Sequence, residues 1–213
     1  MHHKALYMQA EQPLDALRDI KKMMERSSRF ISLSGLSGIA AGICALAGAW
    51  LGRKEILAFH ERSGKYQDGS ILELERSLIT IAAGVFVAAV ISAFVFTYRR
   101  ARQNALPIWD ITARKLMLNT LIPLAAGGIF IMGLMYHGAT VFVGPACLVF
   151  YGLALVNGSN HTLGEIRYLG YCEIILGVIS LWLPGHSLLF WAIGFGILHI
   201  VYGMIMWLKY DRK

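Results

Sequence analysis

Charged residues are scarce in this chain. Asp, Glu, Lys and Arg make up 15% of its 213 residues, whereas an average soluble domain has about 25%. Cysteine and proline are also scarce, with three and five residues, and no Cys-X-X-Cys pair or Cys/His spacing indicates a zinc site. These scarcities exclude a disordered chain, a disulfide framework and a typical cytosolic domain. We expect no metal and no cofactor.

The sequence has long apolar runs without charged residues. The residues between 30 and 52, 77 and 98, and 116 and 164 include no Asp, Glu, Lys or Arg, and Glu173 alone interrupts 168–208. A bilayer-spanning helix needs roughly 20 apolar residues, so the two longer runs each hold two spans. They break at Tyr136-His137-Gly138 and at Pro184-Gly185, which are turn signals. Backbone groups in lipid must pair within their own segment, which favours helices.

The predicted fold is therefore all-α, a polytopic membrane protein with one transmembrane domain over residues 30–208. Six transmembrane helices form three helical hairpins, which are parallel two-helix repeats. The expected spans are 30–52, 77–98, 116–136, 139–157, 168–183 and 188–208.

The distribution of positive charge predicts the orientation. Fifteen Lys and Arg residues fall in the N-terminal tail, the second and fourth loops and the C-terminal tail (209–213), against five in the first loop. Cytoplasmic loops carry the excess of Lys and Arg. We expect both termini in the cytoplasm and the chain in a bacterial inner (plasma) membrane, with no cleavable signal peptide. The net charge of +7 suits anionic lipids at the cytoplasmic face better than nucleic acid.

Residues 1–29 are predicted to lie at the cytoplasmic face. Leu14, Leu17, Ile20 and Met24 recur at helical spacing, and cationic side chains occupy the other faces, which is typical of an amphipathic helix. The helix either lies on the inner leaflet or docks a partner. A homo-oligomer and a second membrane protein are both open as partners.

Glu173 and His199 are the most unusual residues inside the predicted spans. They lie 12 and 14 residues from Gly185, so their depths agree to within a few ångströms at about 1.5 Å per residue. Ionisable residues in spans are functional candidates. Three interpretations are open: a hydrogen bond that holds the last hairpin together, a group for transport or proton sensing, and catalysis. Four more polar residues could support the pair: Tyr151, Tyr202, Asn119 and Asn157.

Glycines share faces with these two residues. Gly170 and Gly177 flank Glu173, and Gly196 and Gly203 flank His199, at the same helical spacing. Small residues let membrane helices approach closely, so we expect the two faces to meet across the last hairpin. Gly38 and Gly42 predict a packing face on the first span.

Two stretches of the chain are similar. Gly128 to His137 matches Gly177 to His186, and Tyr151-Gly152 then corresponds to Tyr202-Gly203. With its glycine-rich helix, Pro184-Gly185 turn and Tyr-Gly pair, the region 116–208 resembles the HdeD-type acid-resistance membrane proteins of bacteria. That resemblance implies a six-helix protein acting in acid stress. The whole chain also resembles uncharacterised six-helix bacterial inner-membrane proteins, which implies no activity.

The sequence favours a small transporter or proton-responsive stress protein that uses the Glu173–His199 pair. A non-catalytic membrane scaffold that docks through its N-terminal helix is the alternative. An intramembrane enzyme is the least favoured interpretation, because no phosphate-cradling loop, nucleophile elbow or His-Glu-X-X-His motif is present.

Overall fold

The protein is helical throughout the part that its structure, a computed structural model, describes: residues 34–66, 71–104 and 109–212. Six helical segments follow one another, and these ranges hold no strand. They are α2 (Gly35–Tyr66), α3 (Ile71–Gln103), α4 (Ile111–Tyr136), α5 (Val143–Gly158), α6 (Glu165–Leu181) and a composite segment from Pro184 to Asp211. The all-α prediction is confirmed. The predicted amphipathic helix and residues 30–33 lie outside the described residues.

Five segments of the described chain are long and apolar enough to cross a membrane, judged by length and composition alone. They are Gly35–Arg62, Ile71–Gln103, Ile111–Tyr136, Thr140–His161 and Pro184–Asp211. The remaining helix, α6, has 17 residues and a length of about 25 Å, somewhat less than the hydrocarbon core of about 30 Å. The chain therefore has the helices of a multi-pass membrane protein.

Local sequence signals position several helix ends. The Asp110 carboxylate caps α4 by accepting a hydrogen bond from the Ala113 N–H at 2.6 Å, as short polar side chains do at an N-terminus. At Gly138, just past the end of α4, φ is +70°, a conformation that glycine adopts without strain. The short 3₁₀ turn η1 (Thr140–Phe142) then leads into α5.

The connector between α2 and α3 is much shorter than the loop expected between residues 52 and 77. Helix α2 continues to Tyr66 and α3 begins at Ile71, so each helix is longer than its expected span. The charges after residue 52 mark an apolar boundary, but charged residues such as Glu and Lys are good helix formers. The helix therefore continues past that boundary, and residues 53–66 are not a loop.

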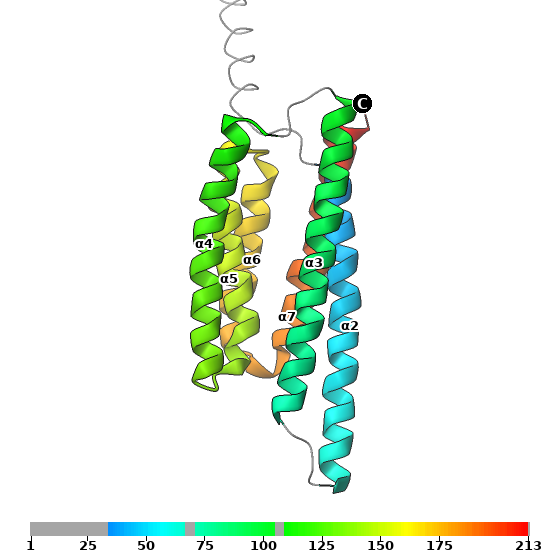
Figure 1. Cartoon of the computed structure of the whole chain (residues 1–213), viewed down its shortest axis with the longest axis vertical. Helices are drawn as coiled ribbons and strands as arrows, with labels where there is room; N and C mark the ends of the chain where they lie inside the picture. Colours follow the sequence, from blue (N-terminus) through cyan, green and yellow to red (C-terminus); the bar gives the residue numbers. More distant parts are fainter. Residues whose placement is uncertain (1–33, 67–70, 105–108, 213) are drawn as a thin grey trace, which may run out of the picture.

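The segments pack as two groups of three. Helix α2 packs against α3 and against the C-terminal segment, while α5 packs against α4 and α6. Figure 1 shows the two groups side by side, with α4, α5 and α6 in one of them. Within each of the first two predicted hairpins, α2/α3 and α4/α5, the two helices pack against each other. The third hairpin is not packed like the other two, since its first helix joins α5 and its second joins α2.

Glycines account for this arrangement. A Cβ at Gly170 would lie 2.8 Å from the Gly152 carbonyl oxygen of α5, and one at Gly177 would lie 3.0 Å from the Pro145 carbonyl oxygen. A Cβ at Gly203 would instead meet the Gly35 carbonyl oxygen of α2 at 2.7 Å. The glycines of the two faces therefore pack against other helices and not against each other, although Glu173 and His199 on these faces do meet, with Oε1 and Nδ1 3.4 Å apart. The sequence shows which face of a helix carries small residues, but it does not show which other helix packs against that face.

The first and last described helices meet at one end of the bundle. The Asp211 carboxylate accepts hydrogen bonds from the Ser34 hydroxyl and the Gly35 N–H, each at 3.0 Å, and forms an ion pair with Arg100 of α3. An acid at a helix N-terminus is favourable to the helix dipole. We refer to this as the Asp211 end.

The two groups are joined at the Asp211 end by polar and apolar contacts. Glu165, at the start of α6, pairs with Lys209 and accepts hydrogen bonds from the Tyr210 hydroxyl at 2.9 and 3.1 Å. Partial burial alone would raise the pKa of the Glu165 carboxyl, but these two partners outweigh it and lower the pKa below its ordinary value of 4.5. Beside them lies a buried apolar cluster of Leu163, Ile166 and Met206.

Candidate functional site

The site begins with an irregular turn in the last helical segment. Between α7 (Ser187–Trp191) and α8 (His199–Met206), residues Ala192–Leu198 form the π-helix η4. A π-helical turn inside an α-helix is frequently found at functional sites. Gly194 and Gly196 are buried in it. Both positions require glycine, because an added Cβ would collide with Glu173 at Gly194 and with Leu46 of α2 at Gly196.

His199 follows this turn directly and uses both ring nitrogens. Its Nδ1 lies 3.0 Å from the Gly194 carbonyl oxygen, and its Nε2 lies 2.8 Å from the Tyr151 hydroxyl. A carbonyl oxygen only accepts hydrogen bonds, so Nδ1 carries the hydrogen. In the neutral imidazole Nε2 then accepts the hydrogen of the Tyr151 hydroxyl. The π-helix thereby assigns the tautomer of the histidine.

Glu173 lies beside the histidine and has no hydrogen bond of its own. Its side chain is completely buried, and its Oε1 lies 3.4 Å from His199 Nδ1. Neither carboxyl oxygen has a hydrogen-bond partner among the described residues. Buried polar groups are usually paired, because an unpaired one costs several kcal/mol relative to water. The carboxyl thus keeps its capacity to take up a proton, a cation or a donor group from a solute.

Apolar side chains surround these polar groups. The Phe195 ring lies 5.0 Å from the Tyr151 ring and 5.9 Å from the His199 ring, centroid to centroid. Leu148 of α5 is fully buried, and it lies against Gly194. A site with such walls excludes bulk water and strengthens electrostatic interactions within it.

The three polar residues come from both groups of helices. Tyr151 lies on α5 and Glu173 on α6, in one group, whereas His199 begins α8 in the other. We call Tyr151, Glu173 and His199 the polar triad. Its hydrogen bond and its carboxyl–imidazole contact therefore cross the boundary between the groups.

The other polar residues singled out in the sequence lie apart from the triad. The Tyr202 hydroxyl lies 3.8 Å from the Cys172 Sγ. The Asn157 amide donates to the Asn119 carbonyl oxygen at 2.7 Å, which joins α5 to α4. Ser180 of α6 was missed by the sequence analysis: it is fully buried, and its hydroxyl has no partner in the described part of the chain. It lies seven residues after Glu173, and this helical spacing was the available signal.

The six glycines predicted to lie on packing faces are all at close helix contacts. Gly38 and Gly42 face the C-terminal segment, where added Cβ atoms would lie 3.2 Å from Gly203 Cα and 2.7 Å from the Gly196 carbonyl oxygen. Their backbones bring α2 against the segment that carries His199. Across residues 34–66, 71–104 and 109–212, no group of three or more His, Cys, Asp or Glu side chains could hold a metal ion.

Comparison with family models, with curated proteins and with solved structures finds no match to this chain. The functional argument therefore rests on the geometry of the triad.

Proposed function

We propose that this is a six-span membrane protein that transfers protons, alone or coupled to a small solute, through the polar triad. The observation that carries the proposal is the Glu173 carboxyl, which is wholly buried, has no hydrogen-bond partner among the described residues, and lies 3.4 Å from an imidazole of the other helix group. A merely structural polar residue would be expected to have its hydrogen bonds satisfied. Intramembrane ionisable residues are characteristic of proton pathways.

The geometry supports a specific proton step. A small approach of the two groups would bring His199 Nδ1 within hydrogen-bond distance of Glu173 Oε1. The proton on Nδ1 then passes to the carboxylate, while Nε2 takes the hydroxyl proton of Tyr151 and the Tyr151 oxygen takes a replacement proton from the medium. The imidazole ends the step neutral, so charge and protons balance. Histidine suits this role because its two nitrogens can accept and release protons near physiological pH.

The proposed topology has both termini in the cytoplasm, with α6 as the sixth crossing. Two observations support it. Ser34 and Asp211 are hydrogen-bonded at one end of the bundle, as an even number of crossings requires. Most Lys and Arg residues are expected at this same end, which favours the cytoplasmic side of a plasma membrane. The resemblance of residues 116–208 to HdeD-type proteins, with its implied role in acid stress, agrees with proton-linked chemistry.

The test is proton flux in liposomes. Purified protein is reconstituted with a pH-sensitive dye inside, and an outward potassium gradient with valinomycin sets the potential. We expect the wild type to acidify the lumen, and Glu173→Gln and His199→Ala to slow this at least about tenfold, as loss of an acid–base group does. Glu73→Gln is the matched control, because it makes the same chemical change at an exposed acid of α3.

Circular dichroism and monodisperse gel filtration establish that each variant folds. Equal flux in wild type and a folded Glu173→Gln variant would overturn the proposal. So would wild-type flux no greater than that of empty liposomes across external pH 5 to 8, the range in which an unperturbed histidine changes its charge.

A further inference from the structure

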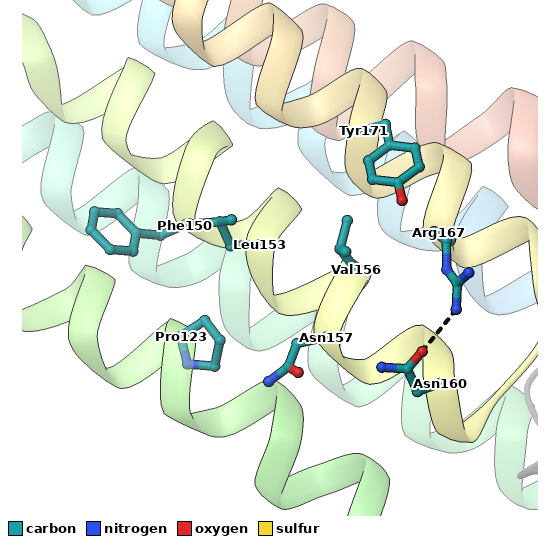
Figure 2. Close-up of a pocket in the computed structure, with 8 residues that line it drawn as sticks. All are labelled: Pro123, Phe150, Leu153, Val156, Asn157, Asn160, Arg167 and Tyr171. Carbon is teal, nitrogen blue, oxygen red and sulfur yellow. Dashed lines mark hydrogen bonds between the residues drawn. The ribbon is translucent and has the colours of Figure 1, made fainter.

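A groove on the outer face of α4, α5 and α6 lies apart from the triad. Its volume is about 560 Å³, within the range of small-molecule sites. Figure 2 shows it bounded by Pro123 of α4, Phe150 and Leu153 of α5 and Tyr171 of α6. Tyr171 and Glu173 are two residues apart on a helix and so point to different faces. The groove is therefore a separate feature from the proposed proton site.

One end of the groove is polar and positively charged. The Arg167 guanidinium donates to the Ser159 hydroxyl at 3.1 Å and to the Asn160 side-chain oxygen at 2.8 Å, and Figure 2 shows the second of these bonds. No carboxylate pairs with Arg167 in the described part of the chain. Two hydrogen bonds hold the side chain in place, and three of its five N–H groups remain for an anion.

Two more donors lie near this cation. The amide nitrogen of Asn160 and the hydroxyl of Tyr171 have no hydrogen-bond partner among the described residues. Tyr171 is four residues after Arg167 and shares its helix face, and Figure 2 shows its hydroxyl directed toward the polar end of the groove. Two donors beside one uncompensated cation match the acceptor oxygens of a phosphate.

The other end of the groove is apolar. Phe150 lies ten residues before Asn160 on the chain, about 15 Å along the helix. The wall between them consists of Leu153, Val156 and Pro123, together with Asn157, whose side-chain amide donates to the Asn119 carbonyl oxygen. A groove with a phosphate-binding end and a hydrocarbon wall of this length matches a phospholipid better than a soluble anion, which has nothing to place against the apolar wall.

We infer that this groove is a specific binding site for one anionic phospholipid, with the phosphate on Arg167 and an acyl chain along Phe150 and Leu153. Arg167 lies two residues after Glu165 and therefore at the Asp211 end, which is the cytoplasmic side in the proposed topology. Anionic lipids are enriched in that leaflet, and basic pockets between transmembrane helices on that side bind their head groups. The donor geometry itself does not depend on the proton-transfer proposal.

The experiment counts bound lipid. Delipidated protein in a neutral detergent is titrated with phosphatidylglycerol or with phosphatidylcholine of the same acyl chains, and native mass spectrometry counts the adducts. We expect one tightly bound phosphatidylglycerol per chain. Arg167→Gln should weaken it about tenfold or more, because a charge-assisted hydrogen bond is lost. Arg114→Gln, which removes an exposed cation of α4 that does not line the groove, should leave binding unchanged.

A second variant and a second ligand separate lipid from free anion. Leu153→Trp keeps the cation but fills the apolar part of the groove, so it should also weaken phosphatidylglycerol binding. Millimolar inorganic phosphate should not displace the lipid. Equal phosphatidylglycerol binding by wild type and Arg167→Gln would overturn the inference, as would equal affinity for phosphatidylcholine or displacement by phosphate. Because the readout is lipid retention, such a failure leaves the flux test of Glu173 unaffected.

Discussion

A single methyl group placed between α5 and α6 should measure how far the bundle depends on close backbone approach. Gly152 and Gly170 face each other across these helices, and each would direct a Cβ at the carbonyl oxygen of the other. The perturbation is Gly152→Ala. Its matched control is Gly128→Ala in the middle of α4, where an added Cβ meets no heavy atom of the described residues within 4 Å.

The expected magnitude follows from the contacts. A Cβ at Gly152 would lie 2.6 Å from the Gly170 carbonyl oxygen, 2.7 Å from Ile174 Cγ1 and 2.9 Å from the Ile174 nitrogen. Two of these atoms are backbone and cannot rotate away, so the helices must separate. Such overpacking costs typically about 1–3 kcal/mol. Both variants gain about 1 kcal/mol of helix propensity, so their difference isolates the packing cost.

The assay is unfolding in mixed micelles, with the loss of helical circular dichroism followed as the mole fraction of SDS rises. Gly152→Ala should have a free energy of unfolding about 1–3 kcal/mol below that of Gly128→Ala. Gly128→Ala should be at least as stable as the wild type. If the two variants unfold together, the close approach of α5 and α6 does not hold the group together, and the reasoning from glycine contacts is refuted.

Two further predictions concern named hydrogen bonds. Tyr151→Phe removes the hydroxyl that donates to His199 Nε2 at 2.8 Å, so liposome proton flux should fall about tenfold or more while the fold survives. Lys209→Met removes the cationic partner of Glu165 and leaves the Tyr210 hydroxyl in place. The lowered pKa of Glu165 means that the pair stabilises the fold above pH 4.5, and that this contribution is lost as pH falls through the lowered value. Unfolding measured against pH should therefore show a wild-type advantage at neutral pH that disappears in acid.

The helices were predictable because their signals are local. Each uncharged run ends at an individual charged residue, which can be read directly from the sequence. All six helical segments include these runs or parts of them. The Asp110 cap and the start of α3 at Ile71 follow from residues next to the helix end. The extension of α2 to Tyr66 was missed, because a boundary of apolar composition is not a boundary of helical hydrogen bonding.

The tertiary arrangement was less predictable. Glycine spacing correctly indicated the faces at which helices pack closely. It did not indicate that Gly170 packs against α5 and Gly203 against α2, because the choice of neighbouring helix depends on how all six helices are arranged. The π-helix at Ala192–Leu198 has no established sequence signature beyond its two glycines. The contact of Tyr151 with His199 joins residues 48 positions apart, and nothing in the local sequence specifies it.

The boundary between the two helix groups suggests which end can open. At the Asp211 end the groups are joined by an ion pair, two hydrogen bonds and an apolar cluster. At the opposite end, one exposed hydrogen bond of 3.2 Å runs from the Ser187 hydroxyl to the Val141 carbonyl oxygen. Fewer polar contacts hold the opposite end, where α7 packs against α5 and α6, so we expect it to separate when the triad exchanges protons with that side.

A disulfide at that end tests this expectation. A Cβ built at Gly144 would lie 3.2 Å from Ser187 Cβ, and disulfides have Cβ atoms about 3.5–4.5 Å apart, so a small adjustment suffices. In a background where the three native cysteines are replaced, Gly144→Cys with Ser187→Cys should cross-link on oxidation and lose proton flux. Reduction should restore it, and each single-cysteine variant should be insensitive to oxidant. Full flux through the cross-linked protein would mean that protons reach Glu173 without separation of the groups at this end, and that the triad acts within a bundle that stays closed there.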